Sequence, residues 1–374
     1  MRALLVNVPA YGSHLRGIPL GLLYIISSAR AHGREIDLLD GSLYRERASF
    51  DREFLSSTHD VIGLSAMTHN IGEALRLARL AREARPGTRV IIGGVHASTV
   101  PEEVLRDCPD CDVLAGEGEE SFIHYLDALD GETSFDEVDG LYRIVDGRAV
   151  ANKVKPIENL DKLPFPAYER IDFSQYTVGV HGLFFKRKPL TSIITSRGCP
   201  FKCSFCAKTA MTGYAWRPRS ASNVLDEIEL LTRQYGIREI HFEDDNIALD
   251  ARRFEEICRG IIERGLDITW KCPHGIYASH LDDGMFSLMK KAGCYSLSFG
   301  VESGNDALLK KAGKASDTAA IRRAIEAAHR AGIECTGFFI FGLEGETRET
   351  ILQTIDFAKS LPLDWAQFNL CIPF

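Results

Sequence analysis

Three cysteines stand close together near the middle of the chain. Cys199, Cys203 and Cys206 have C-x3-C-x2-C spacing, and the next cysteine along the chain is Cys258. Iron–sulfur clusters and structural zinc take four ligands, so a loop with three thiols leaves one position open. A [4Fe–4S] cluster held here would keep one iron free to bind a small molecule with adjacent amino and carboxylate groups.

A zinc site is the alternative for the same three thiols. Zinc bound by three cysteines takes a fourth protein ligand, commonly a histidine. No histidine lies between Arg197 and His241. The pattern therefore favours an iron–sulfur cluster.

The elements that must position this loop alternate from about Leu190 to the end of the chain. Strands are predicted at 191–195, 239–242, 268–271, 296–299, 335–341 and 367–372. Helices are predicted at 222–234, 251–264, 282–292, 319–331 and 347–360. This order predicts a (β/α)6 partial TIM barrel, in which the chemistry collects on the loops after the strands. The cysteine loop follows the first of these strands.

Carboxylates and glycines follow the later strands. Glu243 and Asp244 come directly after the second strand, Glu302 follows the fourth, and Gly342 ends the fifth. Acidic residues on a solvated turn are the alternative interpretation. Their position at the strand ends instead predicts contacts with a bound ligand.

The cysteine spacing, the aromatic Phe205 before the third cysteine and the run Trp-Arg-Pro-Arg-Ser at 216–220 resemble the radical S-adenosylmethionine (SAM) enzymes. In that family the open iron of a [4Fe–4S] cluster binds SAM. The resemblance implies that Glu243 or Asp244 accepts hydrogen bonds from the SAM ammonium group, and that Glu302 binds the ribose. It implies SAM-binding roles for Phe205, Glu243, Asp244, Ser298, Glu302 and Gly342.

Three further residues have two interpretations each. Lys314 could neutralise a carboxylate near SAM, but an exposed lysine is the favoured interpretation. His274 and Tyr277 follow the third strand and are the candidate catalytic residues, as substrate contacts or hydrogen donors. A purely structural role is the alternative for both.

The front of the chain alternates strands and helices in the same way. Strands are predicted at 3–8, 35–39, 61–65, 89–92 and 112–114, and helices at 21–32, 71–85, 102–107 and 119–130. This order predicts a doubly wound, Rossmann-like parallel sheet of the α/β class. Its ligand would lie at the carboxyl ends of the strands.

The loops at those ends resemble the cobalamin-binding domain of B12-binding radical SAM enzymes. The Asp-x-His-x-x-Gly motif that supplies a cobalt ligand in other B12 proteins is absent, since no histidine follows Asp40 closely. A vestigial domain without cofactor is the alternative. The resemblance implies cobalamin contacts from Asn7, Pro9, Ser65, Met67, Thr68, Gly93, Gly94, His96, Ala97, Ser98, Gly116, Glu117, Gly118 and Glu119.

We predict a cobalamin-binding Rossmann-like domain at 1–135, a hairpin and linker at 136–188, and a radical SAM partial barrel at 189–374. The hairpin strands are predicted at 141–145 and 149–153, and a proline-stiffened linker at 160–166. Because the chain stops directly after a strand, we expect a truncated C-terminus.

Composition limits the other possibilities. The net charge of −8 argues against nucleic-acid binding, and no apolar stretch approaches the length of a membrane span. With no signal peptide, ten cysteines predict a reducing cytoplasm rather than a disulfide framework. Cys108 and Cys111 are predicted to be small packed residues, with a redox or metal motif as the alternative.

These features predict a cobalamin-dependent radical SAM enzyme. Its cofactors would be a [4Fe–4S] cluster, SAM and cobalamin, and an electron from a flavodoxin or ferredoxin would start cleavage of SAM to a 5′-deoxyadenosyl radical. The resemblance implies methylation of an unactivated carbon of a small-molecule substrate. A non-methylating rearrangement, cyclisation, dehydration or epimerisation is one alternative. A non-catalytic iron–sulfur redox or scaffold protein is another.

Overall fold

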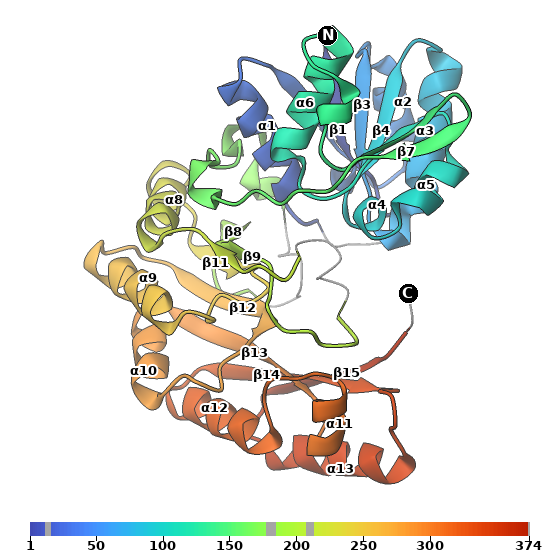
Figure 1. The fold of residues 1–374 in the computed structure, drawn as a ribbon. Helices are drawn as coiled ribbons and strands as arrows, with labels where there is room; N and C mark the ends of the chain where they lie inside the picture. The colour runs from blue at the N-terminus through green and yellow to red at the C-terminus, as the bar shows by residue number, and fades with distance from the viewer. Residues whose placement is uncertain (12–15, 177–184, 207–212, 373–374) are drawn as a thin grey trace. The chain divides into compact units, whose positions relative to one another are not determined.

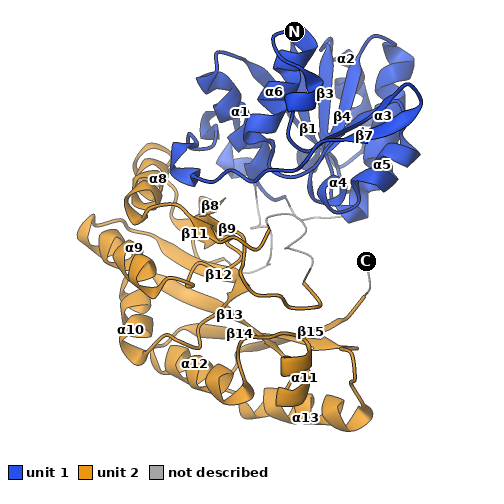
Figure 2. Cartoon of the chain, in the orientation of Figure 1, with its two compact units in different colours: residues 1–180, 210–212 blue, residues 181–209, 213–374 orange. Residues whose placement is uncertain are grey.

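The computed structural model describes residues 1–11, 16–176, 185–206 and 213–372. The chain divides into two compact units (Figure 2). The first contains residues 1–180 and 210–212, and the second contains residues 181–209 and 213–374. The domain bounds expected from the sequence stay predictions.

The first unit is built on a seven-stranded sheet with the order β2-β1-β3-β4-β5-β6-β7 (Figure 1). Strands β1 to β5 are parallel, and β6 and β7 form an antiparallel hairpin. The strands are β1 (Ala3–Asn7), β2 (Ile36–Asp40), β3 (Val61–Ser65), β4 (Arg89–Gly93), β5 (Asp112–Leu114), β6 (Leu141–Val145) and β7 (Arg148–Ala151). The predicted doubly wound α/β fold is confirmed. Strand order reverses between β1 and β3, which marks the ligand-binding end in such sheets.

Six helices are described in the part of this unit that the structure covers. They are α1 (Leu20–Ala31), α2 (Arg47–Ser56), α3 (Ile71–Ala84), α4 (Val95–Thr99), α5 (Pro101–Asp107) and α6 (Gly118–Asp130). The 3-10 turns among the described residues are η1 (Gly41–Leu43), η2 (Thr68–Asn70), η3 (Phe135–Glu137), η4 (Leu160–Lys162), η5 (Tyr168–Arg170) and η6 (Phe173–Gln175). Helices α2 and α4 were not predicted. Helix α2 buries only Phe50 and Phe54, an i,i+4 pair, so its sequence lacks a full apolar stripe.

The predicted hairpin forms because of its turn residues. Asp146 and Gly147 have φ of 49° and 75°. Positive φ at both central positions is the type I′ geometry, which matches the twist of the two strands. The structure confirms β6 at its predicted bounds and ends β7 two residues earlier than predicted.

The second unit is an open, parallel six-stranded sheet with the order β15-β14-β13-β12-β11-β8 (Figure 1). A short antiparallel pair, β9 with β10, is separate from it. The strands are β8 (Leu190–Ile193), β9 (Ser196–Arg197), β10 (Arg217–Pro218), β11 (Glu239–Phe242), β12 (Thr269–Ile276), β13 (Cys294–Glu302), β14 (Glu334–Phe341) and β15 (Trp365–Leu370). The predicted partial barrel is confirmed.

Each helix described in this unit begins at a polar N-cap side chain that accepts a hydrogen bond from a backbone N–H of the first turn. The helices are α8 (Ala221–Gln234), α9 (Ala251–Glu263), α10 (Asp283–Lys291), α11 (Asp306–Lys311), α12 (Thr318–Arg330) and α13 (Arg348–Ser360). Their N-caps are Ser220, Asp250, Asp282, Asn305, Asp317 and Thr347. Helix α11, only six residues long, was not predicted.

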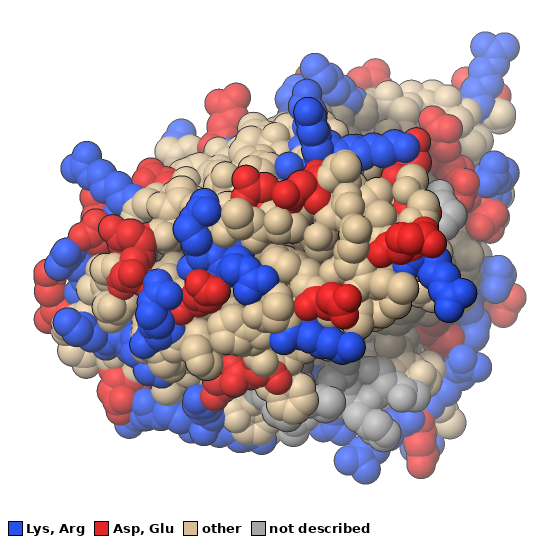
Figure 3. Space-filling model, turned by 90° about the horizontal axis from the view of Figure 1, so that it is seen from below, with Lys and Arg blue, Asp and Glu red and all other residues tan. Residues whose placement is uncertain are grey.

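Apolar packing holds the helices to the sheet. Trp270 of β12 is fully buried, with its ring centroid 5.2 Å from that of Phe242 and 6.0 Å from that of Phe254 on α9. On the face shown in Figure 3, acidic and basic side chains are interspersed. Exposed pairs between helices, such as Arg330 with Asp283, contribute only about 0–1 kcal/mol each. In the described part of the chain, no helix is both long and apolar enough to cross a membrane.

Candidate functional site

The cysteine loop, residues 198–206, follows β8 and β9 at the carboxyl end of the barrel sheet. Gly198 has a φ of 87°, and a Cβ there would lie 2.2 Å from the carbonyl oxygen of Ala215. Only glycine therefore fits before Cys199. The Cys199 N–H in turn donates to the carbonyl of Gly213 at 3.5 Å. The backbone fixes where this part of the loop begins.

The loop packs against the turn after α11. The Ser204 N–H donates to the Ala312 carbonyl at 2.9 Å, and Cys203 Sγ lies 3.7 Å from the Gly313 carbonyl oxygen. Gly313 has a φ of 72°, and a Cβ there would lie 2.7 Å from the Lys202 carbonyl oxygen. Two segments far apart in sequence thus meet at the cysteines.

The three thiols influence one another electrostatically. Burial raises the pKa of Cys203; Lys314 opposes this shift, and Cys206 and Cys199 add to it. Among the described residues, no three His, Cys, Asp or Glu side chains are grouped so that they could hold a metal ion. A [4Fe–4S] cube is larger than an ion, because each of three irons takes a separate thiolate. Three neighbouring thiols match the three thiolates that such a cluster needs.

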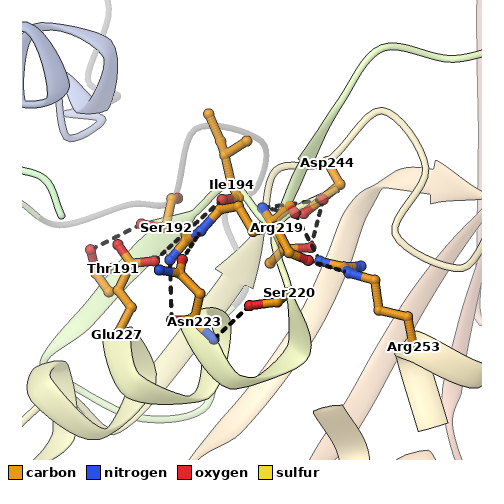
Figure 4. A network of polar contacts seen from close by, with 10 residues as sticks. Thr191, Ser192, Ile194, Arg219, Ser220, Asn223, Glu227, Asp244 and Arg253 are labelled. Carbon is orange, nitrogen blue, oxygen red and sulfur yellow. Dashed lines mark hydrogen bonds and ion pairs between the residues drawn. The ribbon is translucent and has the colours of Figure 1, made fainter. Parts of the chain in front are cut away.

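Two of the three consecutive carboxylates after β11, Asp244 and Asp245, clamp the chain just before the cysteines; Figure 4 shows Asp244. Asp244 Oδ1 accepts from the hydroxyls of Thr195 at 2.8 Å and Ser196 at 2.6 Å, and the Thr195 N–H also points at this carboxylate. Asp245 Oδ2 accepts from the Gly198 N–H at 3.0 Å. Asp244 is buried, and burial raises its pKa while the bonds from Ser196 and Thr195 oppose that shift. Its oxygens are therefore occupied within the protein.

Two buried arginines brace the same strand ends (Figure 4). Arg219 Nη1 donates to the Ile194 carbonyl at 2.9 Å and to Glu227 Oε2 at 2.5 Å. Arg253 donates from Nη2 to the Thr195 carbonyl at 2.8 Å and from Nε to the Arg219 carbonyl at 2.6 Å. These bonds fix helices α8 and α9 to the segment that leads into the cysteine loop.

Glu243 is held by the two neighbouring strands. Its Oε1 accepts from the Ser192 hydroxyl at 2.8 Å, and its Oε2 lies against Nε2 of His274. The register between β12 and β13 shifts between Cys272 and Ile276, and Gly275 has a φ of 94°. Such a bulge re-aims a side chain, here that of His274.

A second bulge, in β13, displays Glu302. The register with β14 shifts between Gly300 and Glu302, and Glu302 has a φ of 62°, which is strained for a side chain of this size. Lys314 Nζ donates to Glu302 Oε1 at 2.9 Å. A Cβ at Gly300 would lie 2.5 Å from Glu302 Oε1 and 2.7 Å from Lys314 Nζ, so the missing side chain makes room for the pair.

The favoured interpretation of Lys314 as an exposed lysine is wrong. Its side chain is 18% exposed and paired with Glu302, which is 9% exposed. The backbone brings it there, because the Lys314 N–H donates to the Leu309 carbonyl and closes the turn after α11.

The remaining predicted barrel residues lie in the cysteine loop, in β13, and directly after β14 and β12. Phe205 is partly exposed in the cysteine loop, and Ser298 is buried in β13. Gly342 follows β14 with a φ of 88°. The Tyr277 ring centroid lies 4.7 Å from that of Phe201 in the cysteine loop, so this ring supports the loop.

In the first unit, the loops after β4 and β5 are joined at the carboxyl edge of the sheet. The Gly116 N–H donates to Ser98 Oγ at 3.0 Å, and Ser98 Oγ donates to the Gly94 carbonyl at 2.9 Å. Gly94 has a φ of 92°, and a Cβ there would lie 2.6 Å from the Ala66 carbonyl oxygen. Backbone packed this closely, without side chains, fits a large ligand that approaches the strand ends.

Other predicted cobalamin residues already have partners inside this unit. Asn7 Nδ2 donates to Asp40 Oδ1 at 2.7 Å, and Glu117 Oε2 accepts from the Ile157 N–H at 2.7 Å. The side chains of Ala97 and Glu119 are buried, and their cobalamin contacts stay predictions. The others lie at or just after the ends of β1, β3, β4 and β5: Pro9, Ser65, Met67, Thr68, Gly93, His96 and Gly118.

Cys108 and Cys111 differ from the prediction that they are two unpaired packed residues. They are buried, as predicted, but the structure joins them in a disulfide. The Cys111 N–H donates to the Cys108 carbonyl at 3.0 Å, and this turn brings their Cα atoms to 5.5 Å, a normal disulfide spacing.

Several residues of the site were not singled out from the sequence. They are Ser192, Thr195, Ser196, Asp245, Gly300 and Arg253. Asp245 had a usable signal, since it is the third carboxylate of one run. The others act through partners that the sequence does not reveal.

The remaining thiols of the second unit give a direct test of the packing. Burial raises the pKa of Cys258, Cys272, Cys294 and Cys335, whereas Cys371 is exposed. A protonated, buried thiol is a poor nucleophile. We therefore expect brief iodoacetamide treatment of the folded, cluster-free protein to label Cys371 but not those four, as mapped by peptide mass spectrometry. Guanidinium should expose all four. Labelling of Cys272 in the folded state would contradict this packing.

Two family descriptions match separate parts of the chain. The Radical SAM superfamily matches residues 193–358, and the B12 binding domain matches residues 12–126. The first segment belongs to the second unit except for residues 210–212, and the second segment falls within the first unit.

Relatives match over nearly the whole chain. An uncharacterized methyltransferase of Pyrococcus horikoshii is 32% identical over 100% of this chain and 81% of its own length. Cytidylyl-2-hydroxyethylphosphonate methyltransferase of Streptomyces wedmorensis is 30% identical over 95% of this chain and 76% of its own.

A solved structure has the same fold. It is the radical S-adenosylmethionine methyltransferase TsrM from Kitasatospora setae, with tryptophan and a SAM analogue bound. The TM-score is 0.82 at 21% identity, covering 99% of this chain and 73% of that one.

Proposed function

The chain belongs to the cobalamin-binding radical SAM enzymes, and we propose that it methylates an unactivated carbon of a small-molecule substrate. When bound, the [4Fe–4S] cluster, SAM and cobalamin supply reductive cleavage of SAM to a 5′-deoxyadenosyl radical and delivery of a methyl group. The protein supplies binding, orientation and exclusion of water. Two relatives in sequence and one solved structure are methyltransferases, which supports methyl transfer.

One observation carries this proposal. The cysteine loop packs directly on the turn after α11, and Lys314 of that turn binds the Glu302 carboxylate. Three thiols and the side chain of Glu302, whose backbone is strained, therefore meet at the carboxyl end of the barrel. Strain of this kind persists where a site needs it. A non-catalytic iron–sulfur protein has no use for the added pair.

We propose Glu243, rather than Asp244, as the acceptor for the SAM ammonium group. Asp244 is buried, and Thr195 and Ser196 donate to it there, whereas Glu243 is partly exposed beside the barrel strands β8 and β12. Glu302 would bind the ribose hydroxyls, with Lys314 beside it near the SAM carboxylate. Phe205, Ser298 and Gly342 would pack around the nucleoside, and Cys199, Cys203 and Cys206 would hold the cluster.

The joined loops of the first unit would hold cobalamin. Gly94, Gly116 and Ser98 form the part with the closest backbone packing. No described side chain of this unit is assigned to the cobalt. A flavodoxin or ferredoxin would provide the electron. The cysteines outside the Cys108–Cys111 disulfide form no disulfides, which favours a reducing, cytoplasmic location.

The test is an anaerobic assay with SAM labelled in its methyl group. The protein is reconstituted with iron and sulfide, with or without cobalamin, reduced, and incubated with a small-molecule extract. We expect labelled methyl product only with cobalamin, detected by mass spectrometry. Formation of 5′-deoxyadenosine without a cobalamin-dependent product would favour the non-methylating alternatives. A cluster whose spectrum does not change when SAM is added would favour the redox or scaffold alternative.

A further inference from the structure

The barrel contains two histidine–glutamate pairs that share strand β11. His241 Nε2 lies 2.9 Å from Glu239 Oε1, at the beginning of β11. The second pair, His274 with Glu243, lies just beyond its carboxyl end. The two pairs have the same chemistry, but only the second lies on the side of the cysteine loop.

The second pair, His274 with Glu243, depends on an irregularity in strand β12. A regular β12 strand would not need the left-handed Gly275, whose φ of 94° accompanies the register shift before Ile276. A bulge costs ladder hydrogen bonds, so it is found where a side chain must be aimed. Here it turns the imidazole onto the carboxylate.

The carboxylate itself is clamped from two strands. Ser192 of β8 donates to one oxygen and His274 of β12 contacts the other. The side chains of Glu243 and His274 are 9% and 18% exposed, so this pair is largely withdrawn from water. Hydrogen bonds to an ionised group are stronger than neutral ones, and more so at low dielectric.

Protonation follows from the partners. An ionised carboxylate only accepts hydrogen bonds, so the imidazole donates from Nε2–H. Each carboxylate oxygen has a second lone pair, so Glu243 can accept further hydrogen bonds without losing Ser192 or His274. An ammonium group is a suitable donor, because it brings three N–H bonds and the opposite charge.

We infer that His274 is a positioning residue that fixes Glu243 to receive the SAM ammonium group. This inference rests on the proposed function and departs from the sequence-based expectation that His274 contacts the substrate or donates hydrogen. Its Nε2 is committed to Glu243. The residue acts through the carboxylate and need not touch the reacting atoms.

The test uses the reconstituted holoprotein and SAM as the probe. SAM affinity is measured by titration, following the change in the electron paramagnetic resonance spectrum of the dithionite-reduced cluster. Formation of 5′-deoxyadenosine without substrate is measured at saturating SAM. The variants are His274→Ala, His274→Gln and, as a matched control, His241→Gln, all compared at equal iron content.

We expect His274→Ala to raise the dissociation constant for SAM about tenfold, which is the size of one charge-assisted hydrogen bond. The rate of 5′-deoxyadenosine formation at saturating SAM should change little, because the lost interaction stabilises bound SAM and the transition state equally. His274→Gln keeps an N–H donor and should recover most of the affinity. His241→Gln removes the imidazole of the other pair, which lies at the beginning of β11, and should leave SAM affinity unchanged.

Two results would overturn the inference. One is unchanged SAM affinity in His274→Ala; the other is an equal loss in His241→Gln, which would reveal a general packing effect. A fall in rate at saturating SAM without a change in affinity includes the first of these results, and it would place His274 in the cleavage step rather than in SAM binding. If the unsubstituted protein forms no cluster that responds to SAM, the proposed function itself fails.

Discussion

Replacing Cys199 with alanine is expected to abolish both cluster binding and SAM cleavage. The loop supplies three thiolates, and each iron that lacks its thiolate loses a ligand that no neighbouring cysteine can replace, because Cys258 is buried between helix and sheet. We expect the visible absorbance of the cluster to disappear. The formation of 5′-deoxyadenosine should fall by at least about a thousandfold, since the chemistry resides in the cofactors.

The control for this variant is Cys371→Ala, which removes an exposed thiol outside the cysteine loop. It should keep the iron content and rate of the unsubstituted protein. Iron and sulfide assays, with chromatography of the nucleoside product, check both variants. Normal turnover by Cys199→Ala would exclude the cluster assignment and the proposed function with it.

The sequence predicts most of the secondary structure here because the signals are local. The prediction of β3 at 61–65 matches the structure, because its apolar run is bounded by polar turns. The starts of α8, α9, α10, α12 and α13 are predicted within one residue, because each of these helices begins at a capping side chain. Helix α2 is not predicted from the sequence, because only two of its residues are buried in the core and the apolar pattern is too weak.

The site divides in the same way between local and distant causes. The cysteine spacing is a local signal and could be read directly. The separate contacts of Glu243, Asp244 and Asp245 could not, because they depend on Ser192, on Thr195 and on Gly198, about 50 positions earlier in the chain. Only strand pairing decides which carboxylate faces which partner.

The bulges show the same limit. Nothing in the residues around His274 or Glu302 states that the register will shift there. Gly275 and Gly300 permit these geometries, but glycine occurs for many reasons. The pairing of Lys314 likewise depends on how the turn after α11 closes on β13.

The network under the cysteine loop should dominate the stability of the second unit. Arg219 and Glu227 are 4% and 0% exposed, so removing one partner leaves a buried charge without compensation. We expect Arg219→Ala to lower the free energy of unfolding by about 3–5 kcal/mol. All three tryptophans, Trp216, Trp270 and Trp365, lie in this unit, so their fluorescence during urea unfolding reports on it alone.

A matched control and a double variant separate the cause of that loss. Arg252 pairs with Glu256 on the surface of α9 and is 90% exposed, so Arg252→Ala should leave the urea midpoint nearly unchanged. Arg219→Met with Glu227→Leu removes both charges and should recover much of the stability, because a buried pair repays its desolvation only in part. The double variant would still lose the bond from Arg219 to the Ile194 carbonyl, which braces the strand before the cysteines. If the double variant recovers stability but binds less cluster, Arg219 positions the segment that leads into the cysteine loop. If Arg252→Ala loses as much stability as Arg219→Ala, burial of the pair is not the cause of the loss.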